Sequence, residues 1–147
     1  MSDNDPSSKT IMIVDDDKSI CTFLEVLLMR EGFRTIVCEG GSSALQKLKS
    51  KAYRKIDLVL LDLMMPAPGG YEVLKELQQP DYQNVPIFIV TARNLDPGAI
   101  VMFKLESNVK EFFNKPIQTP EFKKKIHEHL GTVPKDNPPQ ADVYGNF

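Results

Sequence analysis

The sequence predicts an α/β protein in which a five-stranded parallel sheet carries helices on both faces. Five short apolar runs rich in β-branched residues alternate with five segments whose apolar residues recur at helical spacing. Such alternation is typical of parallel sheets with crossover helices. A length of 147 residues suits one domain of this kind.

Each predicted strand is a run without polar alternation, as expected for a strand buried between two layers of helices. The run at 56–62 is the most continuous, and Pro86 stands near the start of its own run, where proline is tolerated. The predicted strands are Thr10–Asp15, Arg34–Cys38, Ile56–Asp62, Val85–Thr91 and Val109–Phe113.

Each predicted helix combines apolar spacing with residues that favour a helix end. The apolar positions of the five helices fall within 20–28, 44–48, 71–77, 99–105 and 122–130. The end signals are Gly32 after the first helix, Ser42 or Ser43 before the second, Asp96-Pro97 before the fourth and Thr119-Pro120 before the fifth.

The folded unit is expected to span residues 10–130. The polar residues 1–9 predict a disordered N-terminal tail, and residues 131–147 predict a Pro-rich flexible tail or linker. The chain is interpreted as a stand-alone protein acting by protein contact, the alternative being that 131–147 begin a linker to a further domain.

Composition excludes several classes of protein. Lys and Arg number 18 against 20 Asp and Glu, so net charge offers no drive toward nucleic acid or an anionic membrane. No apolar run approaches the ~18–20 residues that span a bilayer, and the N-terminus lacks the features of a secretion signal. We therefore expect a cytoplasmic protein without direct nucleic-acid or membrane contact.

Cysteine and histidine suggest no metal or disulfide site. Cys21 and Cys38 lie in apolar segments and are expected to be reduced core thiols. His127 and His129, among Lys and Glu, are expected at the solvated surface, as are Lys123, Lys124 and Lys125.

Polar side chains gather where the predicted strands end. Asp15, Asp16 and Asp17 end the first strand, Asp62 the third and Thr91 the fourth, and Lys115 follows the fifth. Ligands of an open parallel sheet bind outside the carboxyl ends of its strands. Clustered carboxylates suit Mg²⁺, a carboxylate can act as a nucleophile toward phosphorus, and a hydroxyl and an ammonium group can hold phosphoryl oxygens.

Each of these residues also has a structural interpretation. Asp15 and Asp16 could merely cap the first helix, Thr91 could be an ordinary strand residue, and Lys115 could lie at the surface. Asp62 is harder to explain in this way because an unpaired buried carboxylate is costly.

Four motifs together resemble the receiver domain of two-component response regulators over residues 10–130. They are IVDDD at 13–17, LLDLMMPAPGG at 60–70, VTA at 90–92 and KP at 115–116. The resemblance implies a flavodoxin-like sheet with strand order 2-1-3-4-5. It also implies a phosphoacceptor that catalyses only its own phosphorylation and dephosphorylation.

The resemblance assigns a role to each site residue. Asp62 accepts a phosphoryl group from phosphohistidine on a sensor histidine kinase or a histidine phosphotransfer protein. Mg²⁺ is held by Asp16, Asp62 and the backbone carbonyl of Met64, with Asp15 acting through a water. Thr91 and Lys115 bind phosphoryl oxygens, and the Lys115-Pro116 peptide bond is expected to be cis.

The resemblance also implies a switch and an output face. Thr91 and Phe112 are the expected switch residues. The family commonly has Tyr or Phe at the second position, and Phe112 lacks the hydroxyl that a tyrosine would bring. The fourth helix, fifth strand and fifth helix are expected to bind a downstream protein or output domain, or to form a phosphorylation-dependent dimer. The apolar run 99–105 is either a buried stripe or such a partner surface.

Two other functions are less well supported. A haloacid-dehalogenase-like Mg²⁺-dependent phosphatase would use Asp15 as its nucleophile, but Ser19 departs from that pattern and no acidic pair follows the fourth strand. A flavodoxin-like cofactor binder would need a phosphate loop where Asp15, Asp16 and Asp17 stand.

Overall fold

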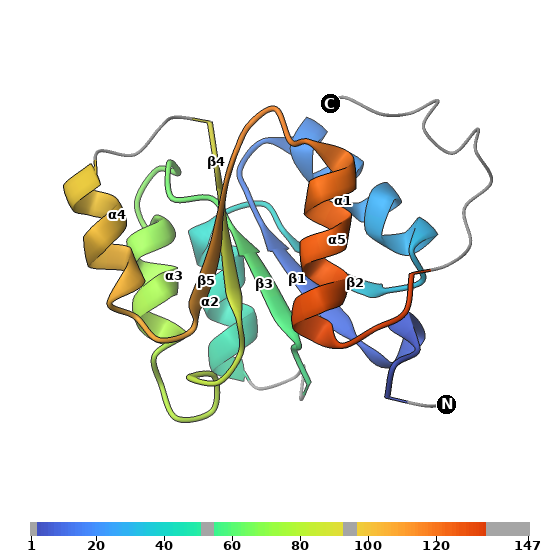
Figure 1. Cartoon of the computed structure of the whole chain (residues 1–147). Coiled ribbons are helices and arrows are strands. Elements are labelled where there is room, and N and C mark those ends of the chain that lie inside the picture. The colour runs from blue at the N-terminus through green and yellow to red at the C-terminus, as the bar shows by residue number, and fades with distance from the viewer. Residues whose placement is uncertain (1–2, 51–54, 93–96, 135–147) are drawn as a thin grey trace.

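The computed structural model describes residues 3–50, 55–92 and 97–134. Its centre is a parallel sheet of five strands in the order β2-β1-β3-β4-β5, as predicted (Figure 1). The strands are β1 (Thr10–Val14), β2 (Arg34–Cys38), β3 (Leu58–Leu61), β4 (Ile87–Thr91) and β5 (Val109–Asn114).

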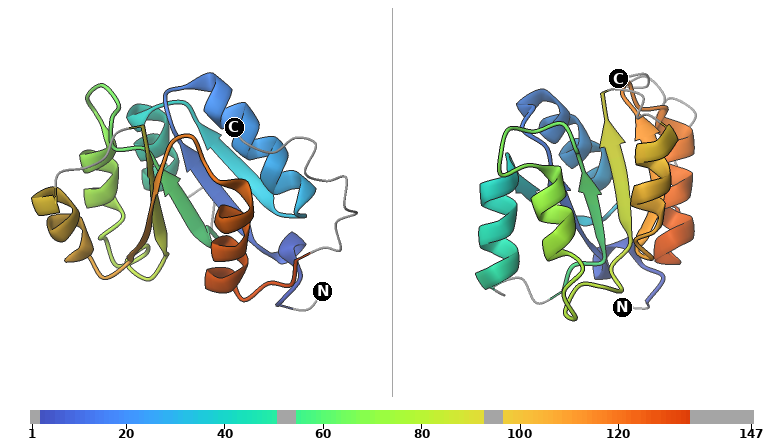
Figure 2. Two further views of the ribbon diagram at one scale, coloured as in Figure 1. Left: turned by 45° about the horizontal axis from the view of Figure 1, so that its top comes forward. Right: turned by 90° about the vertical axis from the view of Figure 1, so that its left-hand side faces the viewer.

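Five α-helices cover the two faces of the sheet (Figure 2). Residues of α1 and α5 share one apolar core with the sheet, and residues of α2, α3 and α4 share the other. The helices are α1 (Lys18–Arg30), α2 (Gly41–Ser50), α3 (Gly70–Glu76), α4 (Pro97–Lys104) and α5 (Thr119–Leu130).

The central strands are apolar on both sides because each side faces a different core. Ile11 and Ile13 pack with α1 and α5, whereas Met12 and Val14 pack with the opposite helices. Successive side chains of a strand point to opposite faces, so burial on both faces requires the unbroken apolar runs seen in the sequence.

Strand register carries the predicted site residues to one edge. Val14 pairs with Leu61, so Asp15 and Asp62 follow at the same level of neighbouring strands. On the other side of β3, Thr91 ends β4 and accepts a hydrogen bond at 2.9 Å through its carbonyl oxygen from the Lys115 N–H.

Two helix starts differ from the prediction. Helix α2 begins at Gly41, so Ser42 and Ser43 lie inside the helix instead of capping it. Helix α5 has Gln118 at its N-cap, because proline is tolerated in the first turn and Pro120 can therefore sit one position further in. The predicted cap Asp96 lies outside the described residues.

The prediction that both histidines lie at the solvated surface is wrong for His127. His127 is 4% exposed, with Nε2 lying 3.0 Å from Glu31 Oε1 and Nδ1 lying 2.7 Å from Thr132 Oγ1. It lies one residue after the core residue Ile126, where α5 packs beside the end of α1. Helical packing therefore buries it, and Glu31 and Thr132 satisfy both ring nitrogens.

The structure also describes both cysteines and parts of the two predicted tails. Cys21 and Cys38 are free and buried, as expected. The predicted N-terminal tail contains a short 3-10 helix, η1 (Pro6–Ser8), and the carbonyl oxygen of Asn4 accepts a hydrogen bond from the Val133 N–H at 3.0 Å. Most of the predicted C-terminal tail, 135–147, lies outside the described residues.

Within the described part of the chain, every helix is too short or too polar to cross a membrane.

Replacing His127 with alanine is expected to lower the free energy of unfolding by about 2–3 kcal/mol. The substitution removes the imidazole ring, so the buried Glu31 carboxylate loses its contact with Nε2 and the Thr132 hydroxyl loses its contact with Nδ1. Urea unfolding measures the change. Lys124→Ala, at an exposed position of the same helix, is the control and should change stability by less than about 0.5 kcal/mol. Equal stability of the two variants would contradict this account.

Candidate functional site

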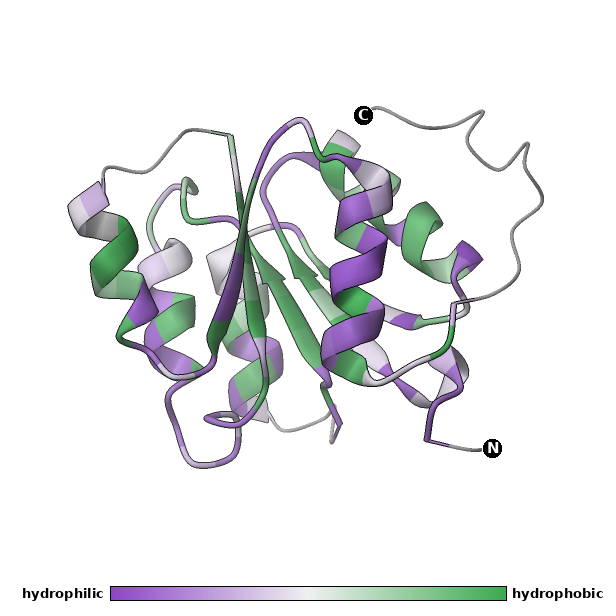
Figure 3. Ribbon diagram, in the orientation of Figure 1, coloured by the Kyte–Doolittle hydropathy of each residue, from purple (hydrophilic) through white to green (hydrophobic). Residues whose placement is uncertain are grey.

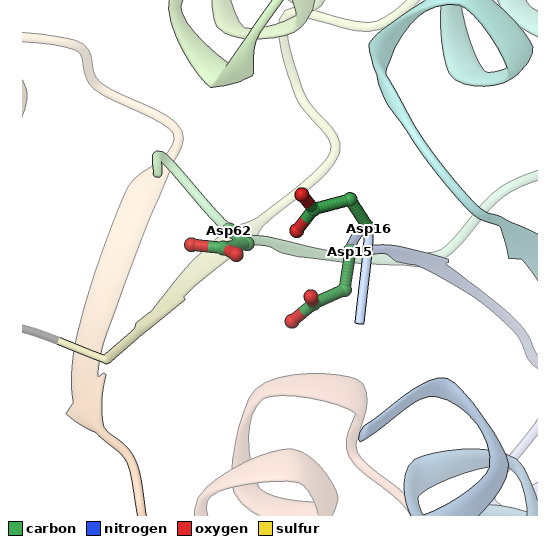
Figure 4. Close-up of side chains that lie close together, drawn as sticks. All are labelled: Asp15, Asp16 and Asp62. Atoms are coloured by element: carbon green, nitrogen blue, oxygen red, sulfur yellow. The ribbon is translucent and has the colours of Figure 1, made fainter. Parts of the chain in front are cut away.

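Three aspartates meet at the carboxyl edge of the central strands. Asp15 follows β1 and is 2% exposed, and Asp62 follows β3 and is 4% exposed. Asp16 is exposed to solvent. One carboxylate oxygen from each residue lies within 4.8 Å of the others, and Figure 4 shows the three side chains grouped together.

Helix capping does not explain Asp15 or Asp16. The N-cap of α1 is Asp17, whose Oδ1 accepts hydrogen bonds from the N–H groups of Ser19 at 2.9 Å and Ile20 at 3.3 Å. Asp15 instead accepts a hydrogen bond from the Asp17 N–H at 2.9 Å. The structural interpretation of Asp15 and Asp16 as helix caps is therefore wrong.

Lys115 reaches into this group from the far end of the sequence. Its Nζ lies 2.7 Å from Asp15 Oδ2 and 3.5 Å from Asp62 Oδ2, and its side chain is 13% exposed. Lys115 is therefore not a surface lysine, and one ammonium group is shared by two buried carboxylates. The Lys115-Pro116 peptide bond is cis, as the resemblance implied.

Burial and charge act in opposite directions on these groups. Burial raises the pKa of Asp15 above its ordinary value, and the nearby Asp62 adds to this, while Lys115 and the Asp17 N–H only partly offset it. For Lys115, burial lowers the pKa, but its contacts with Asp15 and Asp62 prevail and the pKa is raised. The site thus holds more buried negative charge than one lysine neutralises.

Thr91 brings a hydroxyl to the same edge. It ends β4 beside the strand that carries Asp62 and is 2% exposed. Among the described residues, Thr91 Oγ1 has no hydrogen-bond partner. A buried hydroxyl without a partner is rare and costs free energy, which suits a group whose partner arrives later.

The loop after Asp62 folds back onto the carboxylate. The Met64 N–H donates to Asp62 Oδ1 at 2.9 Å, and Met64 itself is 47% exposed. The loop returns so closely that a Cβ atom on Gly70 would lie 2.6 Å from the Asp62 carbonyl oxygen. The absent side chain of Gly70 therefore allows α3 to start beside Asp62.

Phe112 of β5 and the helix α4 belong, with Thr91, to the predicted switch and output region. Phe112 is partly buried in β5, and Lys104 Nζ of α4 lies 5.8 Å from the centre of its ring. The apolar run 99–105 makes α4 mostly green in Figure 3. Phe103 of this run is buried against Tyr71. Val101 and Met102 of α4, and Leu105 just after it, are 60%, 68% and 78% exposed. The interpretation of this run as a buried stripe holds for Phe103 alone among these four.

Sequence reasoning missed one residue that shapes the site. Glu72 Oε2 accepts a hydrogen bond from the Gly69 N–H at 2.8 Å and so closes the loop that follows Asp62. The signal was available, since an acidic residue three positions after a helix N-cap is typical of a capping box.

The chain resembles curated response regulators. It is 34% identical over 126 residues to the DNA-binding response regulator MtrA of Mycolicibacterium smegmatis. The aligned stretch covers 86% of this chain and 52% of that protein. The chain spans about half the length of the curated relatives it matches. A DNA-binding relative gives no support to the expectation that nucleic-acid contact is absent.

Solved structures share the fold. A CheY-like response regulator receiver domain protein from Methanospirillum hungatei superimposes with a TM-score of 0.71 at 25% identity, covering 84% of this chain and 94% of the other. The receiver domain of sensor histidine kinase PA1611 from Pseudomonas aeruginosa, with a magnesium ion coordinated in its active site cleft, gives a TM-score of 0.70 at 22% identity. It covers 84% of this chain and 98% of the other.

Asp15→Asn is expected to raise the free energy of unfolding at pH 7 without Mg²⁺. The pKa of Asp15 in the folded protein lies above its ordinary 3.8, so the folded state binds this proton more tightly than the unfolded chain. The contribution of Asp15 to stability therefore falls as pH rises from 3.8 through the folded-state pKa, and it stays lowered at pH 7.

Urea unfolding at several pH values in the presence of a chelator checks this prediction. The advantage of Asp15→Asn should shrink as the pH is lowered toward 3.8. Asp17→Asn, which keeps a good N-cap residue, should show no such gain. A loss of stability in Asp15→Asn at pH 7 would show instead that the ion pair with Lys115 outweighs the cost of burial.

The family assignment agrees with this geometry. Residues 11–127 match the response regulator receiver domain, which is most of the chain and nearly all of the described fold. The buried Asp62, the neighbouring Asp15 and Asp16, and the inward Lys115 occupy the strand ends at which the four motifs place them. The chain belongs to the receiver domain family of two-component response regulators.

Proposed function

We propose that Asp62 is the phosphoacceptor of this receiver domain. The observation that carries the proposal is its surroundings: a buried carboxylate at the end of a central strand, with two further carboxylates within 4.8 Å and an ammonium nitrogen at 3.5 Å. The donor is phosphohistidine on a sensor histidine kinase or a histidine phosphotransfer protein.

The residues present fit Mg²⁺. Three carboxylates offer hard oxygen ligands from one small volume, and a single lysine leaves part of their charge unbalanced. Asp16, Asp62 and the carbonyl oxygen of Met64 would hold the ion, with Asp15 acting through a water. When bound, Mg²⁺ supplies positive charge to the phosphoryl oxygens. The magnesium in the related kinase receiver domain supports this fit.

The chain's own groups account for the transfer. A carboxylate oxygen of Asp62 forms the new bond to phosphorus while the N–P bond of phosphohistidine breaks, and the imidazole nitrogen leaves with the bonding electron pair. Lys115, held between Asp15 and Asp62, is placed to pair with a phosphoryl oxygen. The Thr91 hydroxyl, for which the described part of the chain offers no partner, would donate a hydrogen bond to another phosphoryl oxygen.

The domain is proposed to act as a switch, not as an enzyme with an external substrate. Movement of Thr91 toward the phosphoryl group would open space for Phe112, whose response must depend on packing because its ring carries no hydroxyl. The face formed by α4, β5 and α5 would then bind an output partner or a second copy. We place this signalling in the cytoplasm.

The phosphatase alternative finds no support. It would make Asp15 the nucleophile, but Asp15 Oδ2 is paired with Lys115 at 2.7 Å and Oδ1 accepts the Asp17 N–H. The family match is to receiver domains.

Incubation with Mg²⁺ and acetyl phosphate should add one phosphate to the protein, seen by intact mass and lost in base. Asp62→Asn should abolish the addition, because it removes the nucleophilic oxygen. Asp15→Asn should retain it only weakly, and Asp17→Asn, which replaces the cap of α1 beside the site, should match the wild type. Phosphate on Asp15 in the wild type would overturn the assignment in favour of the phosphatase.

Thr91→Val is expected to accept phosphate but to lose the structural response to it. Valine matches threonine in shape and removes a hydroxyl that has no partner among the described residues, so stability of the unmodified protein should be equal or higher. Amide NMR spectra with and without beryllofluoride report the response. A response in Thr91→Val as large as in the wild type would remove Thr91 from the switch.

A further inference from the structure

The loop between Asp62 and α3 is restrained at both ends. At its start, the Met64 N–H donates to Asp62 Oδ1 at 2.9 Å, and at its end the Gly69 N–H donates to Glu72 Oε2 at 2.8 Å. A Cβ atom on Gly69 would lie 2.9 Å from the Met65 carbonyl oxygen, so the loop is also folded closely onto itself.

The middle of this loop lies directly against the start of α2. A Cβ atom on Gly41 would collide with the backbone carbonyl group of Pro68 and would lie 3.4 Å from Gly69 N. Because the atoms that it would meet belong to the backbone, no side-chain rotation can relieve the collision. A Cβ atom on the neighbouring Gly40 would lie more than 4 Å from every other atom of the residues that the structure describes, its chain neighbours aside.

A displacement at Pro68 is not easily absorbed inside the loop. Proline fixes its own φ, and two prolines, Pro66 and Pro68, stand between Met64 and Gly69. With Gly69 held by Glu72, movement of Pro68 passes back toward Met65 and Met64. It would therefore disturb the residue that contacts the Asp62 carboxylate.

We propose that Gly41 is a positioning residue for the phosphoacceptor site. By offering no side chain, it lets Pro68 rest on the start of α2, and this contact holds Met64 beside Asp62. The inference rests on the proposed function, in which Asp62 takes the phosphoryl group and the Met64 carbonyl oxygen belongs to the Mg²⁺ site. The proposal adds Gly41, at the start of the helix that follows β2, as a residue that contributes no chemical group of its own to the site.

The first test needs no metal. Amide NMR spectra and hydrogen exchange of Gly41→Ala should show displaced signals for Met64 and Met65 and faster exchange of the Met64 amide, since its bond to Asp62 is weakened. Gly40→Ala is the matched control. It places the same methyl group one residue earlier, directly before α2, where alanine is an unfavourable residue for a helix start. This methyl group does not reach the loop.

The second test measures Mg²⁺ binding by calorimetry. Gly41→Ala should weaken binding about 10-fold or more, as is typical when groups that orient metal ligands are disturbed. Gly40→Ala should bind Mg²⁺ like the wild type even where its thermal unfolding midpoint falls as far as that of Gly41→Ala.

The outcomes separate the two proposals. A wild type that binds no Mg²⁺ and accepts no phosphate overturns the proposed function, while the metal-free spectra still decide whether Gly41 positions Met64. Unchanged Met64 signals and Mg²⁺ affinity in Gly41→Ala overturn the positioning role.

A second variant covers the case in which Gly41→Ala does not fold. Glu72→Ala removes the other restraint on the loop from an exposed position. It should weaken Mg²⁺ binding and speed exchange at Met64. Wild-type behaviour of Glu72→Ala in that case would overturn the proposal, because the site would then not depend on a restrained loop.

Discussion

The ion pair between Lys115 and Asp15 is the interaction on which the arrangement of this site depends. The two residues are 100 positions apart in the sequence, yet Lys115 Nζ lies 2.7 Å from Asp15 Oδ2. The contact requires β1 and β5, which are not neighbours in the sheet, to end at the same edge. Without Lys115, the buried Asp15 and Asp62 would face each other uncompensated, which is among the most costly arrangements in a protein interior.

The site is costly to fold, and the rest of the domain offsets that cost. Burial raises the pKa of Asp15, and the Thr91 hydroxyl is buried without a partner among the described residues. Away from the site, the Thr119 hydroxyl is also buried without a partner among the described residues, but the buried side chain of Asn108 is well paired. Asn108 donates to the Leu77 and Tyr82 carbonyl oxygens and accepts from Gln78. Functional sites commonly retain such unfavourable features because the chemistry needs them.

Two regions connect the site to the rest of the molecule in different ways. The loop after Asp62 is held by the Glu72 carboxylate and by close contact with the start of α2, where Gly41 has no side chain. Helix α4, in contrast, leaves Val101 and Met102 largely exposed, and its Lys104 Nζ lies 5.8 Å from the centre of the Phe112 ring of β5. A restrained loop beside Asp62 and a loosely covered helix would suit the proposed switch, in which phosphorylation at one place changes the surface at another.

The sequence alone determined the strand–helix order and the chemistry at each strand end, because unbroken apolar runs require burial on both faces and parallel strands end at a common edge. Tertiary structure decided what depends on contacts between distant segments. It buried His127 against Glu31, brought Lys115 to Asp15, and set Gly41 against Pro68. Local pattern cannot reveal these features, since residue type and spacing describe one element at a time, whereas each contact depends on how two elements meet.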